Sequence, residues 1–189
     1  MKNIKSISTI KLLTVLFIST FAFTACSNDD DHDEDHEHGK ELITTVTYTL
    51  TNGSDIVTLT YQDLDGEGGN VGTYNVSGPL TASTTYTGVL KLENETEDPA
   101  ENITEEIEEE GDEHEFFFAS SVTGLTITKT DVDADGNPLG IETSLTTSAA
   151  SSGTLTIVLK HEPTKPNDGT VDGSGGSAEV DITFNISVQ

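Results

Sequence analysis

Apolar residues recur at every second position through most of this chain, from residue 46 to the end. The last run is the clearest, and its apolar members are Val180, Ile182, Phe184, Ile186 and Val188. Strict alternation puts these side chains on one face of a β-strand, and that face needs a second sheet to cover it. Threonine, which suits half-buried pleated surfaces, fills many intervening positions. The pattern therefore predicts packed sheets rather than helices.

Similar alternation marks the other strand candidates, which lie between turn-forming residues. The candidates are residues 46–50, 57–61, 84–92, 123–130, 139–147, 153–161 and 179–188. Asn52-Gly53 is a hairpin signal, and residues 163–177, rich in Gly, Pro, Ser and Asp, predict a long loop. Short strands joined in this way predict an all-β fold, an immunoglobulin-like antiparallel β-sandwich over residues 40–189.

One acidic segment, residues 100–110, breaks the alternation. Ile103 and Ile107 are spaced to share one helical face, so we expect one short acidic helix docked on the sandwich. Asp98 is the expected N-cap, with Pro99 in the first turn and Gly111 at the end. Residues 116–118, three phenylalanines, then begin a buried strand.

The first 25 residues have the layout of a secretory signal, with Lys2, Lys5 and Lys11 before an apolar run. That run is shorter than the roughly 20 apolar residues that a membrane span needs. Its end, residues 23–26 (FTAC), resembles the lipobox of bacterial lipoproteins. The resemblance implies removal of residues 1–25 and lipidation of Cys26, the only cysteine. An ordinary signal peptide with a free Cys26 thiol is the alternative.

The residues after Cys26 are strongly polar. Residues 27–31 (SNDDD) resemble the acidic export signal of Bacteroidetes surface lipoproteins, which implies a lipid anchor in the outer membrane and exposure on its outer face. An acidic spacer facing the periplasm is the alternative. Residues 26–39 as a whole contain too little apolar surface to fold, so we expect a lipidated, disordered tether.

The rest of the chain resembles a family of Bacteroidetes-type outer-membrane lipoproteins, often labelled "type 1 periplasmic binding fold superfamily". The shared segments are residues 63–66 (DLDG), 103–110 (ITEEIEEE), 131–140 (DVDADGNPLG) and 161–163 (HEP). The label implies a two-lobed α/β fold, which the alternating strands and the single helix candidate argue against. The resemblance implies a location and no activity.

The chain is strongly acidic, with a net charge of −26 and no arginine. Nucleic-acid binding needs clustered basic residues, so this function is excluded, while cations are attracted. We also expect no enzyme activity, because the one cysteine is assigned to the lipid. The sequence contains no nucleophile motif, phosphate-binding loop or HExxH zinc motif.

Two groups of histidines are candidate ligands for Zn²⁺ or Cu²⁺. His32, His36 and His38 lie among carboxylates in the tether, a combination that suits transition metals. A soluble acidic spacer is the alternative for this segment. His114, within Glu-His-Glu, is a second candidate, with His161 as its partner if the fold brings them together. An isolated surface histidine is the alternative there.

A calcium site is the third candidate. Asp131, Asp133, Asp135 and Glu142 have the spacing of an EF-hand loop, with Gly136 at its turn. The flanking strands and Pro138 depart from that motif, so an acidic turn that binds no ion is the alternative. Residues 63–67 form a poorer version of the same pattern.

Together these features predict an outer-membrane lipoprotein that binds a divalent transition metal. A TonB-dependent receptor is the expected partner in its transport. The alternative is an adhesion or structural module, a β-sandwich on an acidic stalk that contacts protein or glycan.

Overall fold

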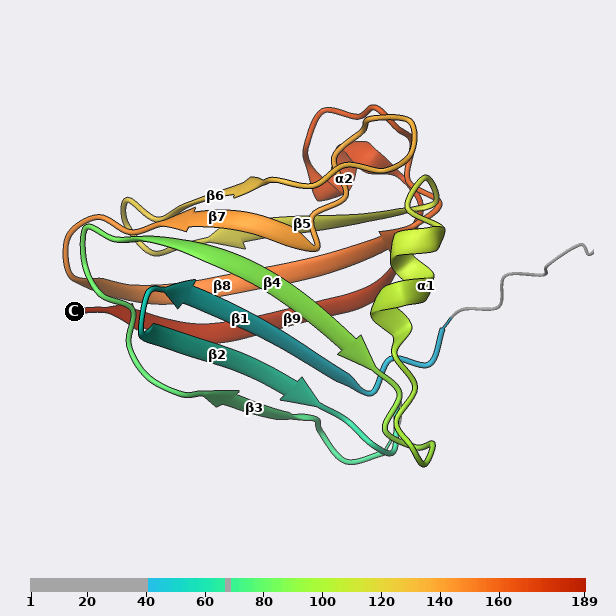
Figure 1. The fold of residues 1–189 in the computed structure, drawn as a ribbon, viewed down its shortest axis with the longest axis horizontal. Coiled ribbons are helices and arrows are strands. Elements are labelled where there is room, and N and C mark those ends of the chain that lie inside the picture. The colour runs from blue at the N-terminus through green and yellow to red at the C-terminus, as the bar shows by residue number, and fades with distance from the viewer. Residues whose placement is uncertain (1–40, 67–68) are drawn as a thin grey trace, which may run out of the picture. The chain divides into compact units, whose positions relative to one another are not determined.

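Two antiparallel sheets face each other in this computed structural model, which describes residues 41–66 and 69–189 (Figure 1). The larger sheet has the order β3-β2-β1-β4-β7-β6 and the smaller has the order β5-β8-β9. The strands of the larger sheet are β1 (Thr45–Asn52), β2 (Asp55–Gln62), β3 (Thr73–Val76), β4 (Thr85–Glu93), β6 (Thr126–Lys129) and β7 (Glu142–Thr146). Those of the smaller sheet are β5 (His114–Ser120), β8 (Ser151–His161) and β9 (Ser177–Val188). The predicted all-β antiparallel sandwich is confirmed.

The core lies between the sheets and follows the alternation of the sequence. In β9, all five alternating apolar residues are buried, while Asp181 and Thr183 face outward. They meet residues such as Tyr48, Leu50 and Leu59 from the other sheet within one apolar cluster. Burying a side chain of this size stabilises the fold by roughly 1.5–3 kcal/mol, so the repeated pattern holds the sheets together.

The predicted strand candidates all contain observed strands, but two short elements were missed. β3 is an edge strand of four residues paired with β2 and mostly exposed, so its two apolar residues, Tyr74 and Val76, are too few to predict a strand. The predicted loop 163–177 contains α2 (Val171–Ser174), a single turn capped by the Thr170 hydroxyl.

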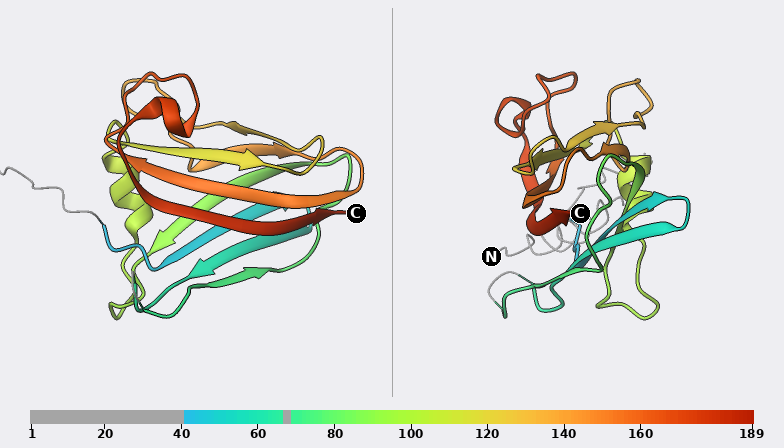
Figure 2. Two further views of the ribbon diagram at one scale, coloured as in Figure 1. Left: turned by 180° about the vertical axis from the view of Figure 1, so that it is seen from behind. Right: turned by 90° about the vertical axis from the view of Figure 1, so that its left-hand side faces the viewer.

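The predicted acidic helix is α1 (Ile103–Glu109), which closes one end of the sandwich (Figures 1 and 2). Ile103 and Ile107 are buried as predicted. The expected start was wrong. Asn94 and Glu101 exchange backbone hydrogen bonds and close a turn that contains Asp98 and Pro99, so the helix begins only after Asn102.

Neither helix in the described part of the chain is long and apolar enough to span a bilayer. The signal sequence, Cys26 and the tether lie outside the described residues, so the expectations for them stay predictions.

Candidate metal centre

The two domain histidines meet where β5 begins and β8 ends. Antiparallel pairing of these strands places His114 directly opposite His161. Their rings stack with centroids 4.9 Å apart and planes inclined by 19°. The fold therefore brings together the two histidines that the sequence could only nominate as a pair.

Two glutamates join His114 at this end of the sandwich. Its Nε2 atom lies 3.5 Å from Oε2 of Glu179 and 3.8 Å from Oε2 of Glu41. The three donor atoms all lie within 4.8 Å of one another. The side chains of His114 and Glu179 are fully buried, and that of Glu41 is 9% exposed. Such a compact histidine–carboxylate group is a candidate metal centre.

A β-bulge explains how a glutamate on β9 enters the interior. Leu159 pairs with Val180 and Lys160 pairs with Ala178, so Glu179 is an extra residue without a partner on β8. A bulge turns a side chain away from the direction that regular alternation would give it. In this strand, it lets Glu179 be buried directly next to Val180, which is also buried.

The hydrogen bond at the other ring nitrogen fixes the form of the His114 imidazole. Its Nδ1 atom lies 3.1 Å from the backbone carbonyl oxygen of Glu110. A carbonyl can only accept, so Nδ1 carries the hydrogen, and in the neutral ring Nε2 has the lone pair. Metal-binding histidines commonly show this arrangement, with one nitrogen donating to the protein and the other facing the ion.

Several donor atoms of this group have no hydrogen-bond partner within the part of the chain that the structure describes. Among the described residues, no hydrogen bond reaches His114 Nε2, Glu41 Oε2 or either carboxylate oxygen of Glu179. A lone pair facing two carboxylates is repulsive, and leaving buried polar atoms unsatisfied is costly. The arrangement becomes favourable when a cation, either a proton or a metal ion, lies among these atoms.

The pKa shifts report the same excess of negative charge. Burial disfavours protonated His114, but its contact with Glu179, the Glu110 carbonyl and the charge of Glu41 outweigh burial and raise the pKa of His114. For Glu41, in contrast, burial raises the pKa and is the main cause of its shift. The negative charge of Glu179 raises the pKa of Glu41 further. Both shifts show that the centre favours uptake of positive charge.

The spacing of the donors fits a small transition-metal ion. Zn²⁺ binds nitrogen and carboxylate oxygen at roughly 2.0–2.2 Å, which separates tetrahedral ligand atoms by about 3.4 Å. The two contacts of His114 Nε2, 3.5 and 3.8 Å, are close to that separation, and all three donor atoms lie within 4.8 Å of one another. Three protein ligands would leave one position for water, and an imidazole ligand suits Zn²⁺ or Cu²⁺ better than Ca²⁺.

A pocket of about 530 Å³ adjoins the centre and has Glu41 and Glu179 in its wall. Asp63 and Asp181 add acidic groups to the lining, while Ile43 is among its apolar residues. The pocket brings an acidic, solvent-accessible surface close to the buried donors, and such a surface concentrates cations near them.

No known protein family, curated protein or solved structure matches this chain. The assignment of the centre therefore depends on its geometry and chemistry.

The loop proposed for calcium uses its carboxylates to hold its own backbone. Asp131 accepts backbone hydrogen bonds from Gly140, Ile141 and Glu142. Asp133 accepts two backbone hydrogen bonds through Oδ1, and its Oδ2 lies 3.0 Å from the Lys165 ammonium group. These contacts fit the acidic-turn alternative, in which a lysine supplies the positive charge.

The remaining carboxylates of this loop point elsewhere. Asp135 is exposed, and Glu142 is an exposed residue of β7. In the poorer motif, Asp63 accepts hydrogen bonds from the Gly66 amide and the Tyr61 hydroxyl, and Asp65 binds Asn70. Among the described residues, neither motif forms a group of three potential metal ligands like the one around His114.

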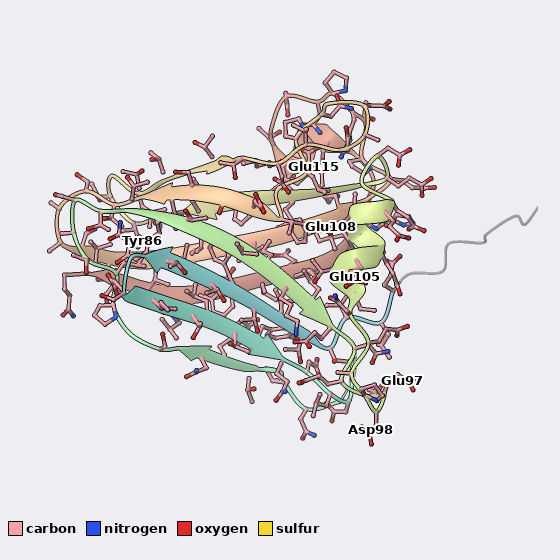
Figure 3. The ribbon with its side chains drawn as sticks, viewed as in Figure 1. Tyr86, Glu97, Asp98, Glu105, Glu108 and Glu115 are labelled. Atoms are coloured by element: carbon pink, nitrogen blue, oxygen red, sulfur yellow. The ribbon has the colours of Figure 1, made fainter. Side chains whose placement is uncertain are left out.

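A second buried polar cluster lies near the loop that carries α2. Glu115, labelled in Figure 3, forms an ion pair with Lys129 and accepts a hydrogen bond from Asn167. Here each carboxylate oxygen has a protein partner, which distinguishes this cluster from the donors around His114.

Proposed function

We propose that this protein is a lipid-anchored outer-membrane lipoprotein that binds a divalent transition metal, Zn²⁺ or Cu²⁺, through His114, Glu179 and Glu41. One observation carries the metal-binding part of the proposal. The Nε2 atom of a fully buried histidine faces two carboxylates, and none of these donor atoms has a hydrogen-bond partner within the described residues. The anchor and the location rest on the N-terminal sequence.

Burial gives this centre a different role from that of the predicted tether. The sequence predicts that the tether with His32, His36 and His38 is disordered, and ligands on a disordered segment capture ions weakly and exchange them quickly. The donors of the centre come from β5, β9 and the segment before β1, so the folded domain holds them in position. We propose that the acidic tether concentrates the ion and that the centre retains it for an outer-membrane transporter.

A calorimetric titration of the purified chain with Zn²⁺, Cu²⁺ and Ca²⁺ at about pH 7.5 tests the metal-binding proposal. The neutral imidazole predicts preference for Zn²⁺ and Cu²⁺ over Ca²⁺. Glu179→Gln should weaken Zn²⁺ binding by at least roughly tenfold, because it removes a charged ligand. Glu108→Gln is the matched control. This substitution removes the same charge from an exposed residue of α1, near the same end of the sandwich (Figure 3).

Equal Zn²⁺ affinity in the Glu179→Gln and Glu108→Gln proteins would contradict the proposal that Glu179 is a metal ligand. Absence of transition-metal binding in the parent protein would instead favour the adhesion or structural module.

A further inference from the structure

The carboxylate of Glu179 has a second buried oxygen that the centre described above does not use. This atom, Oε1, lies 3.7 Å from Nδ1 of His161. Within the described part of the chain, it has no hydrogen-bond partner, and neither does Nε2 of His161. One carboxylate is thus flanked by two imidazoles, with a different oxygen facing each.

The two histidines do not surround one common point. Among the described residues, the donor atoms that lie within 4.8 Å of one another come from Glu41, His114 and Glu179, and His161 is not part of that group. An ion placed among those three residues is therefore beyond the reach of the His161 ring as it lies.

We propose that the centre has a second ion position, between His161 Nδ1 and Glu179 Oε1, so that Glu179 bridges two divalent transition-metal ions. This inference rests on the proposed function of the first position. In two-metal sites the ions are typically about 3.5–4 Å apart, a separation that the two oxygens of one carboxylate can bridge.

Glu113 supplies the group that would orient His161. Its Oε2 atom lies 3.7 Å from Nε2 of His161, on the opposite side of the ring from Glu179. A proton on Nε2 that faces this carboxylate leaves the lone pair on Nδ1, directed at the second position. In His114, likewise, one ring nitrogen faces a protein acceptor and the other faces the ion position. The acceptor there is the Glu110 carbonyl, in the place that Glu113 has for His161.

The second position binds more weakly than the first. It has two protein ligands, so water must complete its coordination. His161 is 13% exposed and Glu113 is 40% exposed, whereas His114 and Glu179 are fully buried. Its ion is therefore held by fewer ligands nearer to solvent and exchanges faster.

The local charge supports occupation by more than one dication. The carboxylates of Glu113 and Glu179 lie close to the two histidines, and that of Glu41 completes the first position. A single dication leaves a negative surplus among these three carboxylates, and that surplus offsets part of the repulsion between two ions.

Stoichiometry is the direct test, with the tether removed from the measurement. In the full chain with His32, His36 and His38 replaced by Gln, we expect calorimetry and native mass spectrometry to find two Zn²⁺ ions per chain, one tight and one weak. His161→Gln should retain the tight ion and lose the weak one. Glu113→Gln should weaken the second ion roughly tenfold or more, since it removes the orienting carboxylate. Glu108→Gln should change neither.

Each alternative result has a distinct meaning. One ion per chain in the parent, or two ions in His161→Gln, overturns the second position and leaves the proposed function intact. Loss of tight binding in a folded His161→Gln protein also overturns it, because His161 would then bind the first ion. If the parent protein binds no Zn²⁺, both the second position and the proposed function are overturned. Circular dichroism of each variant checks the fold.

Discussion

His114 Nε2 faces Glu179 Oε2 across 3.5 Å, with both side chains fully buried. The two residues belong to β5 and β9, the outer strands of the smaller sheet, which are separated by β8. Glu41, just before β1, extends the group toward the larger sheet. An ion bound here would connect both outer strands of one sheet with the segment that enters the other.

Because the ion connects elements of the folded domain, Zn²⁺ should raise the melting temperature. Binding to the folded state alone stabilises it by about 2.7 kcal/mol at a free concentration 100 times the Kd. Thermal unfolding with and without Zn²⁺, and after addition of a chelator, measures the effect. The shift should fall sharply in His114→Gln, which loses the tight ion. An equal shift in that variant would contradict the assignment of His114 as a ligand.

The tether predicts a different response. Replacing His32, His36 and His38 with Gln should remove weak Zn²⁺ or Cu²⁺ binding and leave the zinc-induced rise in melting temperature unchanged. Ligands in a disordered segment contribute to binding and not to folding. Comparison of titrations with thermal unfolding in the same protein separates the two classes. Loss of the melting shift would show that the tether takes part in the buried centre.

The strands could be predicted because alternation is a local property of the sequence. All five apolar residues of the 180–188 run are buried, whereas the missed strand β3 has four mostly exposed residues, too few to show a clear alternation. The start of the 139–147 candidate was too early, since Asp131 binds the backbone amides of residues 140–142 and β7 begins only at Glu142.

The centre could be predicted only in part. His114 and His161 are rare residues within acidic surroundings, which made them candidates, but their pairing depends on the register of β5 and β8. Glu179 was missed because regular alternation from Val180 would place it outside, and the bulge that turns it inward has no signal in the sequence. Glu41 was missed because it is one of many acids and precedes the first strand.

The lipid anchor predicts release from membranes when Cys26 is replaced. Cys26→Ala removes the only thiol that can be lipidated, so the protein should move from the membrane fraction to the soluble fraction. Detergent partitioning of cell extracts measures this change. Replacing the nearby Ser27 with Ala is a control that keeps the thiol. A Cys26→Ala protein that still sediments with outer membranes would contradict the anchor.

Gly88 should not tolerate a side chain, since a Cβ there would overlap the Tyr48 hydroxyl and Thr143 Oγ1. These two groups form a 2.7 Å hydrogen bond in the core, and burial raises the pKa of Tyr48 to about 12. Gly88→Ala should cost about 1–3 kcal/mol of unfolding free energy, measured by urea denaturation. The exposed neighbour change Thr87→Ser should cost less than about 0.5 kcal/mol. Equal stability of the two variants would show that the core can rearrange around the added methyl group.

Asp133 should stabilise the fold through its buried pair with Lys165, whose side chain is only 5% exposed. Asp133→Asn leaves that ammonium without its counter-charge and should lower the free energy of unfolding by about 3 kcal/mol at neutral pH. Asp135→Asn, on an exposed residue of the same loop, is the control and should have little effect.

The pH dependence of this loss identifies the charge as its cause. Burial alone would raise the pKa of Asp133, but hydrogen bonds from Asn137 and Lys165 outweigh burial and lower it below the ordinary value. A carboxylate with a lowered folded-state pKa stabilises the protein fully above its unfolded pKa of about 3.9, and this contribution disappears as pH falls through the folded-state value. The stability difference between the parent and Asp133→Asn should therefore be constant from about pH 7 to pH 5 and should shrink below about pH 4. Urea unfolding across this range measures it. A difference already lost at pH 5 would mean that the folded-state pKa of Asp133 lies above its ordinary value and that Lys165 does not stabilise its charge.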